Sequence, residues 1–275
     1  MMISELKDSE FEKISKLIYE QCGINLHEGK KELVKARLGK RLRECNYKSF
    51  TDYCHFVTTN EGKDELIAMI DSISTNLTSF YREESHFARL QVIVSSILDK
   101  ASARGSVPKF NVWSAGCSTG EEPYTIAISI KEAAKMRQLD ARIFATDIST
   151  KVLQVAEAAI YPKERIKKIA TPVLGKYFQI GTGNSSGYYR LKKDIKDMVT
   201  FQRFNLMDKF PSEANFDVIF CRNVMIYFDK PTQTQLVNKY YSSLKKDGYF
   251  FVGHSESLNA LKHSFKYKEP SVYQK

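Results

Sequence analysis

The sequence predicts an α/β fold with a mostly parallel sheet, preceded by a smaller all-α domain. After Lys109, short apolar runs that end in polar residues alternate with helical patterns, and these runs read FNVWSAG, ARIFATDIS, FDVIFCRNVMIYF and GYFFVGHSE. Such alternation is typical of βαβ units. Before residue 90 the apolar residues recur at helical spacing instead. We therefore expect a helical domain at 1–90, a linker at 91–108 and a sheet domain at 109–275.

Composition fits a globular protein with a substantial core. The 275 residues are 43% hydrophobic and 27% charged, and no apolar run approaches the roughly 18 residues of a membrane span. The first residues form an amphipathic pattern rather than a signal peptide, so we expect a cytoplasmic protein of bacterial type. The five cysteines lack C-x-x-C spacing and predict reduced thiols with no structural metal.

The net charge of +10 and the pI of about 9.2 allow nucleic acid, an anionic membrane or an acidic protein as partner. Much of the charge lies in residues 27–46, HEGKKELVKARLGKRLRECN, around an apolar helical stripe of Val34, Leu38 and Leu42. This tract is either a solvated helix face or a docking face for an acidic partner.

The remaining segments have distinct textures. Phe11, Ile14, Leu17 and Ile18 predict a first helix that ends at Gly23. Residues 91–108 indicate a connecting helix that runs into a polar loop. The turn-rich, β-like stretch between residues 175 and 205 predicts an antiparallel β-hairpin inserted in the sheet domain, at about 176–204.

Ligands of open α/β sheets bind beyond the carboxyl ends of the strands, so the residues after each apolar run are candidates for a site. They are the glycine loop from Gly116 to Gly120 with Glu121 and Glu122, then Asp147, then Cys221, Arg222 and Asn223 with Tyr227 a turn later, and finally His254, Ser255 and Glu256.

The glycine loop predicts a nucleotide-like ligand without phosphate. Its glycines let the backbone approach a ligand, but the Lys and Ser/Thr of a phosphate loop are missing, and Glu121 and Glu122 would repel phosphate. S-adenosylmethionine carries a sulfonium, an ammonium and a ribose diol, and it fits better. Asp147 is placed to accept hydrogen bonds from that diol, although an Asp after a strand can also cap a helix. Of the two glutamates, Glu122 is expected to contact the cofactor and Glu121 to begin the helix.

Two further clusters bear on the acceptor of the methyl group. The run STNLTSFYRE, residues 74–83, contains poor helix formers and is at least as compatible with a loop over the cofactor as with a helix surface. The run RNVMIYF lacks the Pro-Pro-aromatic sequence common in amino-methyltransferases. Arg222 and Asn223 occupy this position instead. They are either site residues or residues that form an ion pair and cap a helix.

Together, TNLTSFYRE, VWSAGCSTGEEPYTIAI, FATDIS, FDVIFCRNVMIYFD and GHSES resemble the chemotaxis receptor methyltransferases, the CheR family. Their order and spacing match along essentially the whole chain. The resemblance implies a class I S-adenosylmethionine methyltransferase domain (Rossmann-like) behind an all-α domain. It also implies methyl transfer to glutamates of chemoreceptor cytoplasmic domains, giving γ-methyl esters and S-adenosylhomocysteine.

The resemblance carries roles to individual residues. The implied cofactor contacts are Asn76, Thr78, Arg82, Gly116, Glu122, Asp147, Asn205, Leu206, Arg222 and Asn223. Arg82 and Tyr227 match positions near the transferred methyl group. The face implied to bind receptor helices contains Arg37, Arg41 and Arg43. Some family members hold a receptor C-terminal peptide on the hairpin insertion, which here is either such a tether or a simple lid.

The implied chemistry needs no general base, since a glutamate carboxylate with a pKa of about 4.3 is already ionised at neutral pH. We expect Arg82 to position a carboxylate and Tyr227 to hydrogen-bond nearby. The alternatives are methylation of RNA or a small molecule, and a non-catalytic sensor that binds the cofactor. The basic tract lacks the interleaved aromatic residues that stack on bases, so we expect no nucleic-acid partner. We also expect no direct membrane insertion and a monomer.

Overall fold

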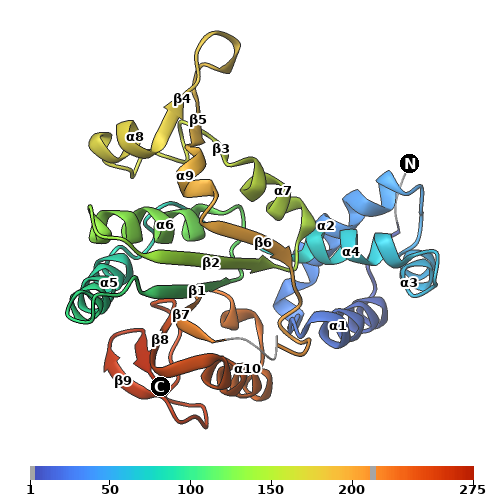
Figure 1. The fold of residues 1–275 in the computed structure, drawn as a ribbon. Coiled ribbons are helices and arrows are strands. Elements are labelled where there is room, and N and C mark those ends of the chain that lie inside the picture. The colour runs from blue at the N-terminus through green and yellow to red at the C-terminus, as the bar shows by residue number, and fades with distance from the viewer. Residues whose placement is uncertain (1–3, 211–214) are drawn as a thin grey trace.

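The fold has a central sheet, a helical domain beside it and a small projecting sheet (Figure 1). It is given by a computed structural model that describes residues 4–210 and 215–275. Residues 1–3, with which the predicted helical domain begins, and residues 211–214 of the predicted sheet domain lie outside the described residues.

The main sheet confirms the predicted α/β class. Its seven described strands have the order β6-β2-β1-β7-β8-β10-β9. Neighbours from β6 to β8 are parallel, and β10 is antiparallel to both β8 and β9. The strands are β1 (Lys109–Ala115), β2 (Asp140–Asp147), β6 (Val199–Arg203), β7 (Phe216–Cys221), β8 (Leu244–Val252), β9 (Lys266–Glu269) and β10 (Val272–Gln274). Each of the four apolar runs quoted above overlaps one of the parallel strands, β1, β2, β7 and β8.

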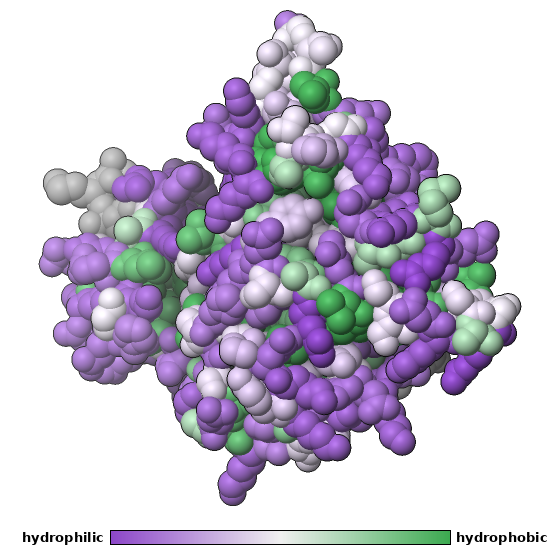
Figure 2. Space-filling view, turned by 90° about the vertical axis from the view of Figure 1, so that its left-hand side faces the viewer, coloured by the Kyte–Doolittle hydropathy of each residue, from purple (hydrophilic) through white to green (hydrophobic). Residues whose placement is uncertain are grey.

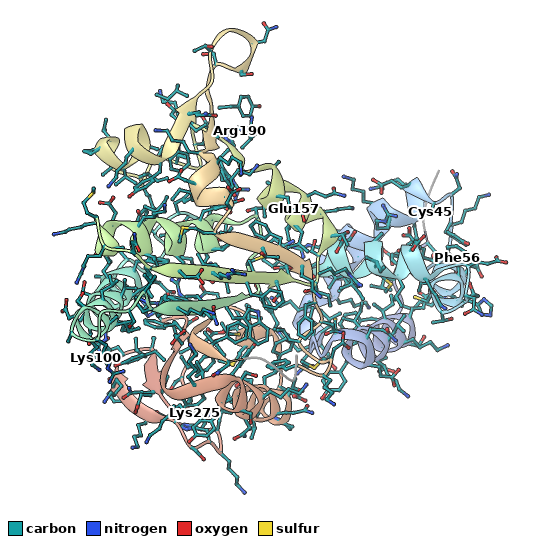
Figure 3. All side chains as sticks on the ribbon, viewed as in Figure 1. Cys45, Phe56, Lys100, Glu157, Arg190 and Lys275 are labelled. Carbon is teal, nitrogen blue, oxygen red and sulfur yellow. The ribbon has the colours of Figure 1, made fainter. Side chains whose placement is uncertain are left out.

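Side chains of the central strands alternate between two buried layers, since successive strand residues face opposite sides. In β1, Val112 packs in one layer and Trp113 in the other, and in β7 Val218 and Ile219 divide in the same way. Side chains fill the space between the sheet and its helices (Figure 3).

Three longer helices cover the two faces of the sheet. They are α5 (Ser85–Ser102), α6 (Glu121–Ala134) and α10 (Lys230–Ser243). Helices α5 and α6 pack together in the layer that holds Val112, whereas α10 belongs to the layer that holds Trp113. The predicted end of the helical domain, residue 90, and the start of the predicted linker, residue 91, both lie inside α5. Its apolar side chains pack in the core of the sheet domain, so α5 is part of that domain.

The helical domain contains α1 (Asp8–Cys22), a 3₁₀ turn η1 (Glu28–Lys30), α2 (Lys31–Glu44), α3 (Phe50–Val57) and α4 (Lys63–Ile73). Its separate core includes Ile14, Ile18, Val34 and Leu38, as the helical spacing predicts. Gly23 ends α1 with a left-handed φ of 74°, which glycine adopts without steric cost.

The predicted insertion is a three-stranded antiparallel sheet in the order β3-β5-β4, which projects from the main body (Figure 1). Its strands are β3 (Ile160–Pro162), β4 (Phe178–Ile180) and β5 (Tyr188–Leu191). The surrounding elements are α7 (Thr150–Ala158), α8 (Thr171–Tyr177), η2 (Gly183–Ser185) and α9 (Lys193–Lys196). The predicted limits of 176–204 therefore need correction at both ends, because β3 lies before them and β6, inside them, belongs to the main sheet.

The surface and the thiols agree with the compositional analysis. One face of the molecule is largely hydrophilic, with hydrophobic side chains in small separate patches (Figure 2). None of the described helices is long and apolar enough to cross a membrane. All five cysteines are free, and Cys22, Cys117 and Cys221 are buried.

Candidate functional site

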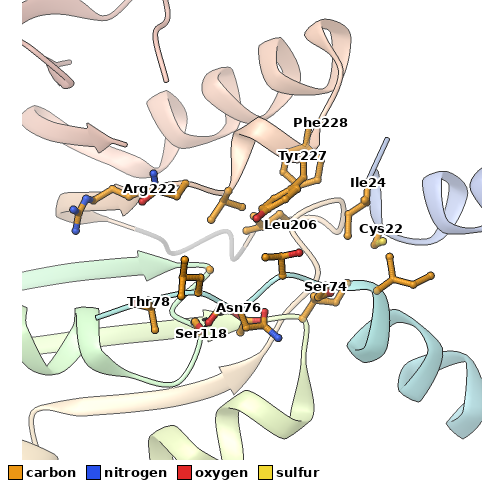
Figure 4. Close-up of a pocket in the computed structure, with 18 of the residues that line it drawn as sticks. Cys22, Ile24, Ser74, Asn76, Thr78, Ser118, Leu206, Arg222, Tyr227 and Phe228 are labelled. Atoms are coloured by element: carbon orange, nitrogen blue, oxygen red, sulfur yellow. Dashed lines mark hydrogen bonds between the residues drawn. The ribbon is translucent and has the colours of Figure 1, made fainter. Parts of the chain in front are cut away.

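A single pocket at the carboxyl ends of the parallel strands brings the predicted site residues together (Figure 4). Every residue predicted to hold the cofactor or to act in the chemistry lines it. These residues are Asn76, Thr78, Arg82, Gly116, Glu122, Asp147, Asn205, Leu206, Arg222, Asn223 and Tyr227. They come from five separate segments of the chain, so the fold, and not local sequence, assembles the site.

The glycine loop after β1 brings its backbone close to neighbouring segments. Gly116 has a φ of 84°, and a Cβ added there would lie 2.4 Å from Cγ2 of Val224. Gly120 has a φ of 92°, and a Cβ there would lie 2.8 Å from Cβ of Ala156. Larger residues would be strained at both positions. The loop therefore presents bare backbone to the pocket and leads directly into α6.

Glu121 and Glu122, although adjacent, have different surroundings. Glu121 is fully buried, begins α6 and forms an ion pair of 2.6 Å with Arg165. The prediction that it begins the helix is confirmed. Glu122 lines the pocket, where its two carboxylate oxygens accept hydrogen bonds from Ser114 Oγ at 2.7 Å and from Arg222 Nη1 at 2.9 Å. Burial raises the pKa of Glu122 above its usual range, although Arg222 and Ser114 oppose the shift.

Arg222 connects the sheet to the segment before α5. Its side chain is 2% exposed, and its Nη2 lies 3.0 Å from Oε2 of Glu83 and also donates to the carbonyl oxygen of Arg82. Burial raises the pKa of Glu83, but the charge and hydrogen bond of Arg222 outweigh it, so this pKa is lowered. Arg222 thus holds two carboxylates, Glu83 and Glu122, on either side of one guanidinium.

Sequence reasoning missed Glu83, although it ends the run TNLTSFYRE. Glu83, His86 and His254 form a group whose potential metal-ligand atoms lie within 4.8 Å of one another. The Glu83 carboxylate, however, already binds Arg222. Burial, with the charge of Arg222 second, lowers the pKa of His86 to about 3, so the state of His86 does not decide against a metal, whereas the pairing of Glu83 with Arg222 does. We assign Glu83 to the support of Arg222 rather than to a metal.

Asp147, at the end of β2, is 8% exposed and lines the pocket. Its Oδ2 accepts a hydrogen bond from the Ser118 N–H at 2.8 Å, and its Oδ1 accepts one from the Ser149 N–H at 3.0 Å. Burial raises the pKa of Asp147 and these backbone donors oppose it. The alternative that Asp147 caps a helix is wrong, because the N-cap residue of α7 is Ser149. Each Asp147 oxygen keeps further acceptor capacity, so both remain available to a ligand.

The segment 74–83 forms a loop over the pocket and not a helix. The Asn76 carbonyl oxygen accepts a hydrogen bond from Ser118 Oγ at 2.9 Å, which ties this loop to the glycine loop. Arg82 donates from Nη1 to the Leu77 carbonyl oxygen at 2.8 Å. The side chain of Leu77 is 80% exposed beside the pocket.

Two further predicted residues join the sheet domain to the helical domain at the pocket. Asn205 donates from Nδ2 to the Gln21 carbonyl oxygen at 2.6 Å. The carbonyl oxygen of Tyr227, in the 3₁₀ turn η3 (Met225–Tyr227), accepts a hydrogen bond from the Asn25 N–H at 2.8 Å. The Tyr227 ring points into the pocket, opposite Asn76 and Ser118 (Figure 4).

The helical domain supplies a pocket wall that sequence reasoning missed. It consists of the segment between α1 and α2 and the first turn of α2, with Cys22, Ile24, Asn25, Leu26, Lys30 and Leu33. The only sequence signal was the CGIN segment after the first helix, which we interpreted as a helix end.

The three predicted docking arginines differ in what they contact. Arg37 donates from Nη1 to the Ser74 carbonyl oxygen at 3.0 Å, at the end of α4. Arg41 donates from Nε to Glu65 at 3.0 Å, and its side chain is only 16% exposed. Arg43 is exposed, and the structure gives it no ion pair within the described residues. Two of these side chains therefore hold the helical domain together.

The pocket meets the chemical requirements of S-adenosylmethionine. Glu122 provides negative charge for a cationic ligand, Asp147 provides acceptors for a diol, and Gly116 admits close contact with the backbone. A mostly parallel sheet with such a pocket at its switch point defines a Rossmann-like, S-adenosylmethionine-dependent methyltransferase.

Comparison with known families identifies the particular group. Residues 76–273 match the family described as "CheR methyltransferase, SAM binding domain", and residues 9–74 match "CheR methyltransferase, all-alpha domain". The protein belongs to the CheR methyltransferase family, and the family assignment suggested by its motifs is confirmed.

Curated relatives agree over nearly the full length. A chemotaxis protein methyltransferase of Borreliella burgdorferi is 42% identical over 271 residues, which cover 97% of this chain and 94% of the relative. One of Escherichia coli K12 is 39% identical over 269 residues, 98% and 91% of the two chains. Chemotaxis protein methyltransferase 2 of Pseudomonas aeruginosa is 37% identical over 265 residues, 96% and 92%.

Proposed function

We propose that the protein transfers a methyl group from S-adenosylmethionine to glutamate side chains of methyl-accepting chemotaxis receptors, leaving γ-glutamyl methyl esters and S-adenosylhomocysteine. The observation that carries this proposal is the convergence of Arg82, Glu122, Asp147 and Tyr227 on one pocket in a chain of the CheR family. S-adenosylmethionine supplies, when bound, an electrophilic methyl group on a sulfonium.

The sheet side of the pocket is proposed to hold the cofactor. Glu122 faces the cationic portion, Asp147 accepts hydrogen bonds from the ribose diol, and Asn205 with Leu206 contacts the base. Arg222 and Asn223 complete this side, and Thr78 and Asn76 close it from the loop above. Because Arg222 is already paired with Glu83 and Glu122, its charge is largely neutralised, and it orders the site more than it attracts an anion.

The acceptor carboxylate is ionised at neutral pH, so the protein has to position it and to exclude water. Arg82 is suited to positioning, since its Nη1 is anchored on Leu77 and the guanidinium keeps further donors. A full ion pair with the attacking oxygen would weaken the nucleophile, so we place Arg82 beside the carboxylate rather than on it. Tyr227 directs its ring into the same space (Figure 4).

The basic side of α2 is proposed as the docking face for acidic receptor helices. Arg43 and Lys40 are its exposed cations, although Lys40 lies 3.9 Å from Glu44. Arg37 and Arg41, which we also predicted as contacts, are proposed to act mainly by holding α2 against α4.

Three finer proposals complete the account. A receptor C-terminal peptide adds to the small sheet at β4, an edge strand whose Ile180 is 62% exposed, since an exposed edge can pair with an extended peptide. The protein acts as a monomer, because one chain supplies the whole pocket. It works in the cytoplasm, where the acceptor domains of chemoreceptors lie.

The test is transfer of labelled methyl from S-adenosylmethionine to a panel of receptor cytoplasmic domains, each with and without its C-terminal tail, and to total RNA. We expect label on receptor domains and none on RNA. Label on RNA alone would replace the acceptor, and tight cofactor binding without transfer to any acceptor would indicate a sensor. A tail that makes no difference would remove the peptide proposal only.

A further inference from the structure

We propose that Glu256 is a positioning residue that fixes the segment 222–227 for methyl transfer, an inference that rests on the proposed function. Glu256 follows β8 in the GHSES motif and is 8% exposed. It is absent from the residues that line the pocket in the described parts of the chain. Any effect on the reaction must therefore act through other residues.

The Glu256 carboxylate accepts four backbone hydrogen bonds. Its Oε2 binds the N–H groups of Gly253 at 2.6 Å and Asn223 at 2.8 Å. Its Oε1 binds those of Val224 at 3.1 Å and Ile226 at 3.2 Å. Three of these four donors belong to the segment that carries Arg222, Asn223 and Tyr227.

The segment needs this support because it lies between regular elements. Buried backbone N–H groups require partners, and here one side chain supplies them where strand β7 has ended. Asn223 also has a φ of 58°, a left-handed conformation that persists only where the surroundings impose it. Glu256 is therefore the group that holds this strained turn in place.

Packing around the turn leaves little freedom for an alternative. A Cβ added at Gly253 would lie 2.9 Å from both the Asn223 nitrogen and Glu256 Oε2. On the opposite side of the turn, Val224 packs closely on Gly116, where an added Cβ would lie 2.4 Å from Val224 Cγ2. Movement of the turn would thus alter the glycine loop, the Arg222 side chain and the Tyr227 ring together.

The chain offers a matched control for a purely structural role. Asp217, near the start of β7, accepts a hydrogen bond from the Asn111 N–H and an ion pair from Lys245, both at 2.7 Å. It is a partly buried carboxylate that supports backbone, as Glu256 is. It lies at the opposite ends of the strands from the pocket, however, so its loss should lower stability without affecting the reaction.

The experiment compares Glu256→Gln with Asp217→Asn. The amide of Glu256→Gln keeps one oxygen, so two of the four N–H groups face an NH₂ donor. We expect kcat with a receptor domain at saturation to fall about 10-fold or more, as for loss of a group that orders a transition-state site. We expect the dissociation constant of S-adenosylhomocysteine, measured by calorimetry, to rise about 5-fold. Asp217→Asn should lower Tm but keep both values within about twofold.

A folded Glu256→Gln with wild-type kcat would overturn the inference, and so would equal losses in the two variants. If Glu256→Gln does not fold, Gly253→Ala decides instead. This variant keeps the Glu256 carboxylate, but its added Cβ would clash with the Asn223 backbone nitrogen. It should therefore reproduce the loss of kcat, and an unchanged kcat would refute the positioning role. If wild-type protein methylates no receptor, the proposed function fails, while S-adenosylhomocysteine affinity still judges Glu256 separately.

Discussion

The two walls of the pocket are built differently. On the sheet side, Glu122, Asp147 and Arg222 each make at least two hydrogen bonds to protein groups, so their positions are fixed before any ligand binds. On the side of the helical domain the lining is largely apolar, as with Ile24 and Leu33. Preorganised charge suits a cofactor that is the same in every turnover. The apolar wall and the exposed loop suit a protein acceptor that arrives and leaves.

Arg82→Ala should have the largest effect, because Arg82 lies on the loop between the walls and is proposed to serve both ligands. We expect kcat/KM for a receptor domain to fall about 100-fold or more, since misplacement of a reacting group can cost that much. Tm should change little, as the Arg82 side chain makes one hydrogen bond within the described residues, to the Leu77 carbonyl oxygen. Labelled methyl transfer measures the rate. Substitution of the exposed Arg104 by Ala provides the control. Wild-type kinetics in Arg82→Ala would exclude Arg82 from the chemistry.

Glu122→Gln tests the fixed charge of the sheet wall. Loss of the carboxylate should weaken S-adenosylmethionine binding about 10-fold. The sign of the pH dependence follows from the raised pKa of Glu122. The ionised form favours the cationic cofactor, so affinity is highest above that pKa and falls as the pH drops through it.

Calorimetry from about pH 8 down to about pH 4, near the ordinary carboxyl pKa, measures this dependence, and Glu122→Gln should flatten it. Without cofactor the sign reverses. A raised carboxyl pKa stabilises the folded state at low pH, and this contribution is lost as pH rises through the folded pKa. Equal pH profiles for both proteins would contradict the role of Glu122.

Arg41→Ala and Arg43→Ala separate the structural from the docking part of α2. Arg41→Ala leaves Glu65, whose side chain is 12% exposed, without its ion-pair partner, and should cost about 1–3 kcal/mol of stability. Arg43→Ala should leave Tm unchanged and raise KM for the receptor domain about threefold, more at low salt. Thermal denaturation and methylation kinetics measure the two effects. A receptor KM unaffected by Arg43→Ala would remove that residue from the docking face.

Leu77→Ser should have the smallest effect. The exposed Leu77 side chain stands beside the pocket, and we expect it to pack on the acceptor helix. Loss of the Leu77 side chain should raise KM for the receptor domain about twofold, as for burial of part of one apolar side chain, without changing KM for S-adenosylmethionine. Met136→Ser, at a 97% exposed position away from the pocket, is the control. Equal kinetics in the two variants would contradict the contact.

The sequence sufficed for the sheet wall because each of its residues directly follows an apolar run. Asp147 and Arg222 could be placed at the strand ends by topology alone. Tyr227 and a loop at TNLTSFYRE could be proposed from the residues, but the roles of the individual loop residues and of the Asn205–Leu206 pair required the family resemblance, since a loop has no periodicity that fixes its direction. The predicted limits of the β insertion were wrong because β3 and β4 have three residues each, too few to show a strand pattern in the sequence.

The wall from the helical domain could not be predicted, because its formation depends on how two separate cores meet. Contacts such as Asn25 N–H to the Tyr227 carbonyl join residues far apart in sequence. The same holds for Glu83, whose partner Arg222 lies in another segment. Glu256 was a candidate by its position after a strand, but its backbone partners in residues 223–226 could not be predicted. Arg41 shows the opposite error, since its basic surroundings suggested an exposed face while Glu65, on another helix, was its partner.

The most direct test of the central claim is to identify the atom that receives the methyl group. Purified protein, S-adenosylmethionine with a labelled methyl and a receptor cytoplasmic domain would be incubated, and the product digested and analysed by mass spectrometry. We predict label on glutamate side chains that is released by mild base, and about 100-fold slower labelling with Arg82→Ala. Base-stable label, or label on any other side chain, would contradict this prediction.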